Sequence, residues 1–168
     1  MKRVYTKRIM SNRENRIWNV VITLSVCFMT GHSKAGQPTG FADKLESGRK
    51  KHTIRANYEY WAGKARMINE GRMVLHIRQW VGRPYYSPQV ELRQMHSLRI
   101  QKISVYYAEL QSVEPTVVVD GRVLSQQEVE QLAHNDGLSY EEWLEWMCPK
   151  RKPLMNGVVL HFTDDLSY

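Results

Sequence analysis

The chain has 168 residues, of which 42% are hydrophobic and 24% charged, a composition that excludes a disordered chain and predicts one globular domain. Its net charge of +7 favours polyanionic partners such as RNA, nucleotides or acidic membranes. Cys27 and Cys148 lie far apart without CxxC or CxxH spacing, which argues against a disulfide framework or a zinc site and suits a reducing compartment.

The N-terminal region is basic and lacks a hydrophobic period. We expect residues 1–18 to form a loosely ordered basic arm and residues 19–168 to form the domain. The following apolar run, "IWNVVITLSVCFM", loosely resembles a signal peptide, but polar residues interrupt it and no small-x-small cleavage site follows. It is also too short to cross a bilayer. Residues 20–29 are therefore predicted to form a buried strand, and the protein is expected in the cytoplasm without membrane contact.

A loop rich in glycine and small polar residues is predicted for residues 30–40. A short helix should follow, with Thr39 as its N-cap and Gly48 near its C-terminal end. The segment "KHTIR", residues 51–55, is typical of a short strand. In the next segment, "YEYWAGKARMINEG", apolar residues spaced by three or four predict an amphipathic helix that Gly71 ends.

The second half of the chain alternates strand patterns with turn signals. Residues 72–80 alternate and predict a strand, 81–89 a turn, and 90–107 one or two further strands. Asp120-Gly121 marks the tip of a hairpin. The capping boxes Ser125/Glu128 and Ser139/Glu142 begin two helices, and "GVVLHFT" closes the chain as a strand. The total, about six strands with short helices at their connections, favours an α+β domain built on a small β-barrel.

The segment "GRKKHTIRAN" contains five basic or potentially basic residues around Thr53: Arg49, Lys50, Lys51, His52 and Arg55. Strand alternation places Lys51, Thr53 and Arg55 on one face, and Lys50 and His52 on the other. Three interpretations are open. The segment is a solvated edge strand, an anion pocket in which guanidinium and hydroxyl groups donate to oxygen, or a site where a lysine of lowered pKa accepts a proton.

A second cluster, "HIRQWVGRPYY", interleaves arginines with aromatic residues, including Arg78 and Trp80. This pattern suits stacking on a base with contact to a phosphate, or equally core aromatics with surface arginines. In "YEEWLEWMC" the helix-spaced Tyr140, Trp143, Leu144 and Met147 indicate core packing. The six histidines show no metal-ligand spacing, so His76 and His161 are expected to be structural, and neither a metal nor a cofactor is predicted.

Several blocks occur in an order that resembles ASCH domain proteins, in particular a bacterial and phage branch with K-x-HTIR and RQW-x-G-x-PY blocks. The blocks are "TLSVCFMTGHSKAGQPTGFADKLESGRKKHTIRANYEYW", "GRMVLHIRQWVGRPYYSPQVE", "AHNDGLSYEEWLEWM" and "GVVLHFT", which together span roughly residues 19–163. The resemblance implies a PUA-like small β-barrel with a cleft beside a helix.

More distantly, the "GRKKHTIR" stretch resembles small ASCH amidohydrolases that deacetylate acetylcytidine. The resemblance implies Thr53 as nucleophile, Lys50 as its base and Asp136 as the proton shuttle to the leaving amine. Two features depart from that pattern. Asp136 is one bond, about 1.5 Å, shorter than the family's glutamate, and alternation requires a bulge or turn at Lys51-His52 to bring Lys50 to the Thr53 face. Asp136-Gly137 also has a purely structural interpretation as a link between helices.

The main expectation is therefore a domain that binds RNA or a nucleotide-like ligand in a basic and aromatic cleft. Its contacts, beyond the three catalytic candidates, are expected from six residues: Arg49, Lys51, Arg55, Asn57, Arg78 and Trp80. The alternative is an amidohydrolase that acts on an acylated cytidine-like nucleoside, and a third reading is an interaction protein with a decayed site.

Overall fold

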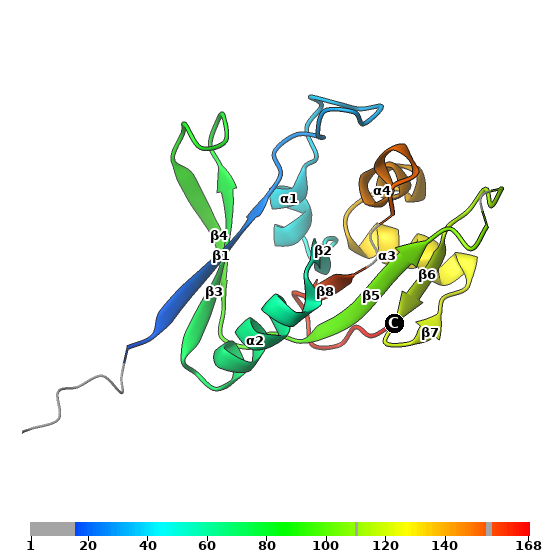
Figure 1. Cartoon of the computed structure of the whole chain (residues 1–168). Helices are drawn as coiled ribbons and strands as arrows, with labels where there is room; N and C mark the ends of the chain where they lie inside the picture. Colours follow the sequence, from blue (N-terminus) through cyan, green and yellow to red (C-terminus); the bar gives the residue numbers. More distant parts are fainter. Residues whose placement is uncertain (1–15, 110, 154–155) are drawn as a thin grey trace, which may run out of the picture.

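The computed structural model describes residues 16–109, 111–153 and 156–168 (Figure 1). The predicted basic arm lies outside the described residues up to position 15, and the first strand begins at Trp18. In chain order the elements are β1 (Trp18–Leu24), α1 (Phe41–Glu46), β2 (His52–Ala56), α2 (Tyr58–Asn69), β3 (Met73–Trp80), β4 (Gln89–Met95), β5 (Ile100–Tyr106), β6 (Thr116–Val119), β7 (Arg122–Val123), α3 (Gln126–Asn135), α4 (Tyr140–Met147), a 3₁₀ turn (Pro149–Arg151) and β8 (Gly157–His161).

The strands form two sheets. One has the order β1-β3-β4, with β1 parallel to the central strand β3, and the other has the order β2-β8-β5-β6-β7 with antiparallel pairs. The predicted α+β class is confirmed. The described residues hold eight strands instead of about six, and no ladder among them joins the two sheets into a closed barrel.

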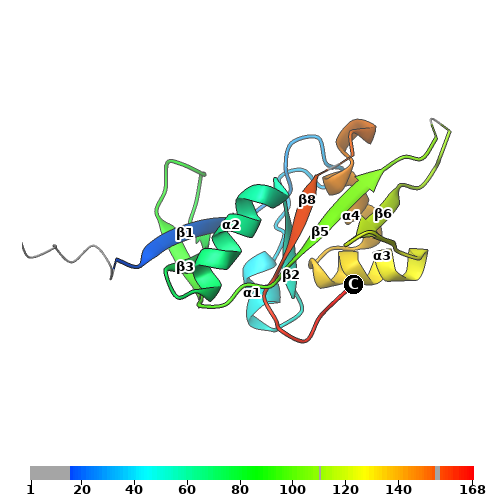
Figure 2. The same ribbon diagram turned by 60° about the horizontal axis from the view of Figure 1, so that its bottom comes forward.

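The core lies between the sheets and the helices that cover them. Helix α2 contacts β3, β5 and β8, so it bridges the two sheets on one side (Figures 1 and 2). Its Trp61, Ala65 and Ile68 are buried, as their helical spacing predicts. Helices α3 and α4 pack against each other, and Trp143 of α4 is fully buried. The described part of the chain holds no helix with the length and apolar character needed to cross a bilayer.

Local signals in the sequence account for most boundaries. Both capping boxes are formed, at Ser125 and at Ser139. The β6–β7 turn has positive φ at Asp120 and Gly121, as a type I′ turn requires. Two expectations are wrong in detail. Strand β1 ends at Leu24 instead of continuing to residue 29, and the N-cap of α1 is Gly40 instead of Thr39.

Both differences have one cause, the folding of the β1–α1 connection back onto the end of β1. The Thr39 hydroxyl donates to the Ser25 carbonyl oxygen at 2.6 Å, and the Thr39 amide donates to the Val26 carbonyl oxygen at 2.9 Å. Phe28 N–H donates to Gln37 O, also at 2.9 Å. The backbone after Leu24 is thus satisfied by its own loop and not by a neighbouring strand. This loop brings Ser25 to the edge of the candidate site.

Candidate functional site

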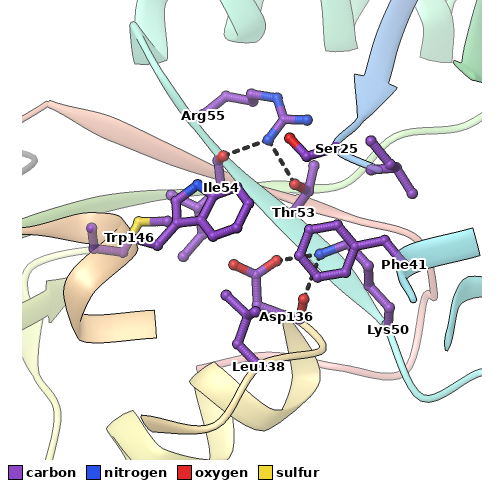
Figure 3. Close-up of a pocket in the computed structure, with 11 residues that line it drawn as sticks. Ser25, Phe41, Lys50, Thr53, Ile54, Arg55, Asp136, Leu138 and Trp146 are labelled. Atoms are coloured by element: carbon purple, nitrogen blue, oxygen red, sulfur yellow. Dashed lines mark hydrogen bonds and ion pairs between the residues drawn. The ribbon is translucent and has the colours of Figure 1, made fainter. Parts of the chain in front are cut away.

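Lys50 and Asp136 form a buried ion pair where the start of β2 meets the α3–α4 link. Lys50 is 2% exposed and Asp136 is 3% exposed. The Lys50 ammonium donates to Asp136 Oδ1 at 2.6 Å and to the Asp136 backbone carbonyl oxygen at 2.5 Å (Figure 3). Asp136 therefore does not point to solvent, although it is also the C-cap residue of α3.

Lys50 and Thr53 line one pocket, without a bulge in the strand. Alternation does not extend to Lys50, because β2 begins at His52, which pairs with His161. Lys51, between Lys50 and His52 in the chain, is held by two other segments. Its amide donates to Asn135 O at 2.7 Å, and its carbonyl oxygen accepts from Phe162 N–H at 2.8 Å. These hydrogen bonds hold the backbone before β2 to the end of α3 and to the residue after β8, with Lys50 directed toward the α3–α4 link.

Gly137 explains how an aspartate reaches the lysine. Its φ of +84° lies in the left-handed region, and a Cβ placed there would lie 3.5 Å from Lys50 Cβ and 3.5 Å from Phe41 Cδ1. The α3–α4 link therefore lies directly against the lysine, and the backbone approach compensates for the shorter side chain of Asp136.

Arg55 holds the Thr53 hydroxyl. Its Nη1 donates to Thr53 Oγ1 at 2.8 Å and to Ile54 O at 2.9 Å, and its Nη2 donates to Thr23 O at 3.0 Å. Since the hydroxyl oxygen accepts a hydrogen bond from a guanidinium, its own proton is available to a base or a ligand. In Figure 3, Arg55 and Ser25 lie beside Thr53 on the side away from Asp136.

The pocket is small and is lined by both charged and apolar side chains. It has a volume of about 30 Å³, and Phe41, Leu138 and Trp146 line it together with the charged groups. The Lys50 ammonium lies 4.1 Å from the centroid of the Phe41 ring, within cation–π range. A wider pocket of about 420 Å³ adjoins it and shares Arg55 and Trp146 with it.

Burial dominates the electrostatics of the pair. Burial lowers the pKa of Lys50, and the Asp136 carboxylate acts against this shift. Burial raises the pKa of Asp136, and the charges of Lys50 and Arg55 act against that shift. Together the two shifts bring the pKa values of Lys50 and Asp136 closer to each other. Burial, followed by repulsion from Lys50, also places the pKa of His52 well below its usual value, so His52 is neutral at pH 7 and does not add to the basic segment.

The remaining candidates lie away from this pocket. Arg49 is exposed and Lys51 is half-buried, and neither belongs to the described lining. Asn57 caps α2 by accepting the Tyr60 N–H at 3.1 Å. Arg78 Nε lies 3.8 Å from a carboxylate oxygen of Glu91. Of the six predicted ligand contacts, only Arg55 therefore lines the pocket that Lys50 and Thr53 share.

Trp80 instead lines a second groove, next to the β3–β4 turn. His76 forms hydrogen bonds with Glu91 and Asn19, and buried His161 forms one with Gln101. Within the described residues no group of three or more His, Cys, Asp or Glu side chains could hold a metal ion.

The sequence did not indicate the pocket walls. Trp146 lies off the helical stripe of Tyr140, Trp143, Leu144 and Met147, and a large aromatic residue off the core stripe is the signal in the sequence that could have indicated this wall. Phe41 of α1 is buried, and its ring also faces the Lys50 ammonium.

No family model, curated protein or solved structure matches this chain.

Proposed function

We propose that this chain is an ASCH-type, PUA-like domain that binds an acylated, cytidine-like nucleoside and hydrolyses its exocyclic amide. The observation that carries the proposal is the convergence of Lys50, Thr53 and Asp136 on one pocket, with Arg55 bonded to the threonine hydroxyl. A buried ion pair alone is weak evidence for function, because many such pairs are structural. Here the pair borders an accessible pocket beside a polarised hydroxyl group.

The size of the pocket selects which part of the ligand enters it. A volume of about 30 Å³ holds a group the size of a water molecule, such as a methyl or a carbonyl, and not a whole base. The adjoining pocket of about 420 Å³ is in the range of small-ligand sites, and Trp146 offers it an aromatic face. A base in the wider pocket would thus direct only a short acyl group toward Thr53.

The reaction uses three groups. Thr53 Oγ attacks the acyl carbonyl carbon, and its proton passes to the amine form of Lys50, which the lowered pKa makes accessible. The C–N bond then breaks, and the leaving exocyclic nitrogen takes a proton through Asp136, which exchanges protons with Lys50 at 2.6 Å. Water hydrolyses the threonyl ester, which releases the carboxylic acid and restores the hydroxyl group. Arg55 stays hydrogen-bonded to Thr53 Oγ1, and its positive charge stabilises negative charge that develops beside this oxygen.

Hydrolysis of acetylcytidine by wild type and two Thr53 variants tests this proposal. We expect Thr53→Val to reduce kcat/KM by about a thousandfold or more, because the nucleophile is lost, and Thr53→Ser to retain part of the activity. Thr116→Val, at the start of β6, is the matched control and should act as wild type. Background rates for wild type, or normal activity of Thr53→Val in a folded protein, would refute the reaction.

The second candidate is binding of RNA or a nucleotide-like ligand without chemistry. One observation favours it: the Lys50 ammonium already donates both to the carboxylate and to the backbone carbonyl of Asp136, and these two hydrogen bonds favour the protonated form of the lysine. In that case wild type binds acetylcytidine and cytidine without turnover, and replacement of Arg55 weakens binding. Equilibrium titration with both nucleosides separates the two candidates.

A further inference from the structure

A second groove continues from the Lys50–Asp136 pocket toward the turn between β3 and β4. It has a volume of about 590 Å³ and is lined by residues 23–30, by Trp80 and by the turn residues Gly82, Arg83 and Pro84. Leu24 and Ser25 line both this groove and the Lys50–Asp136 pocket. Figure 1 shows the β3–β4 turn and the β1–α1 loop at the same end of the molecule.

The turn presents aromatic faces and a cation to solvent. Tyr85 is 87% exposed and Tyr86 is 78% exposed, values unusual for large aromatic side chains. The Trp80 and Tyr85 ring centroids lie 5.4 Å apart, and the Arg83 guanidinium lies 4.3 Å from the centroid of the Tyr86 ring. Aromatic rings with an adjacent arginine are the elements on which single-stranded nucleic acids stack.

The turn is ordered by its own hydrogen bonds. Gly82 N–H donates to Ser87 Oγ at 3.0 Å, Ser87 Oγ donates to Arg83 O at 2.9 Å, and Val81 N–H donates to Pro88 O at 3.0 Å. Tyr85 has a φ of +68°, an unfavourable conformation for a non-glycine residue. A turn held in this way loses little conformational entropy when it binds a partner.

Charge also favours a nucleic acid strand. No carboxylate lines the groove among the described residues, whereas Arg83 does, and Arg55 stands at the adjoining pocket. The whole chain carries a net charge of +7. A free nucleoside in the pocket beside Trp146 would leave this groove of about 590 Å³ and its aromatic turn without a ligand.

We infer that the groove binds the nucleotides that flank the acylated base, so that the substrate is a modified cytidine-like base within a single-stranded RNA. This inference rests on the proposed function for its central base. Flanking bases stack on Trp80 and Tyr85, and Arg83 contacts a phosphate. A duplex should bind more weakly, because its bases are stacked on one another and must be unstacked before they reach these rings.

Fluorescence anisotropy with a labelled single-stranded RNA of about ten nucleotides, containing one acetylcytidine, tests the inference. Wild type should bind this strand more tightly than free acetylcytidine, and more tightly than the same sequence as a duplex. Tyr85→Ala should weaken binding by about 5- to 150-fold, the range for one lost base stack. Arg83→Ala should lower the salt slope of the affinity by about 0.7.

Tyr60→Ala and Arg66→Ala are the matched controls, since both residues are exposed on α2, away from the groove. Both should bind the strand as wild type does. Hydrolysis of free acetylcytidine should be unchanged in Tyr85→Ala and Arg83→Ala, because neither residue lines the Lys50–Asp136 pocket.

The outcomes separate this inference from the proposed reaction. Equal affinity for strand and nucleoside, equal affinity for strand and duplex, or turn variants that match their controls would each overturn the inference while the reaction stands. Strand binding that depends on Tyr85 and Arg83, with the acetyl group left intact, would support the groove and refute the reaction.

Discussion

Replacement of Lys50 alone should lower the free energy of unfolding far more than replacement of Lys50 and Asp136 together. Their side chains are 1% and 5% exposed and lie 2.6 Å apart. At an effective dielectric constant near 20, Coulomb's law gives an attraction of about 6 kcal/mol at that distance, and the loss of hydration for two buried ions offsets most of it. Lys50→Met retains the hydration penalty of the carboxylate and loses the attraction.

We therefore expect Lys50→Met to lower the free energy of unfolding by about 3–5 kcal/mol at pH 7. The double variant Lys50→Met/Asp136→Leu should recover at least about 2 kcal/mol of this loss, since it buries no unpaired charge. Lys102→Met, at an exposed position of β5, is the control and should change stability by less than about 0.5 kcal/mol.

The assay is urea unfolding at several pH values. In Lys50→Met the pKa of Asp136 is raised by burial without a lysine to oppose it, so the unfolded state releases the proton more readily than the folded state. Stability of the variant should fall as pH rises above the ordinary aspartate value, and its deficit relative to wild type should shrink in acid. A deficit below about 1 kcal/mol at pH 7, or a double variant no more stable than Lys50→Met, would refute this account of the pair.

Two further predictions concern the surroundings of the pair. Gly137→Ala should destabilise the protein by about 1–2 kcal/mol in thermal unfolding. The cost comes from the backbone φ of +84°, since the nearest atoms, 3.4–3.5 Å away, leave room for a methyl group. An unchanged melting temperature would show that the α3–α4 link relaxes. Burial lowers the pKa of His161 to about 4, below its unfolded value of about 6.5. The unfolded state therefore binds more protons in that window, so stability should decline by roughly 2 kcal/mol as pH falls from 7 to 4.5. His161→Gln, which can still donate to Gln101, should flatten the decline, and an equally steep profile in the variant would exclude His161 as its source.

Local chemistry in the sequence determined most elements of the fold. The capping boxes at Ser125 and Ser139, the Asp120-Gly121 turn and the helical spacing in α2 each act within a few residues, and each is formed as predicted. The α+β class follows from the order of these elements. The arrangement into two sheets does not, because strand partners such as β1 and β3 are chosen by contacts between segments distant along the chain.

In the candidate site, too, the sequence determined some features and contacts between distant segments determined the others. The sequence, with its resemblance to ASCH domains, identified Lys50, Thr53 and Asp136 as residues to consider together, but strand alternation placed Lys50 and Thr53 on opposite faces. Only the tertiary structure decided the matter. β2 begins after Lys51, and Gly137 allows the α3–α4 link to lie against Lys50, so a carboxylate 86 residues away meets the ammonium at 2.6 Å. Such a contact depends on where two backbones meet, and no local pattern encodes that position.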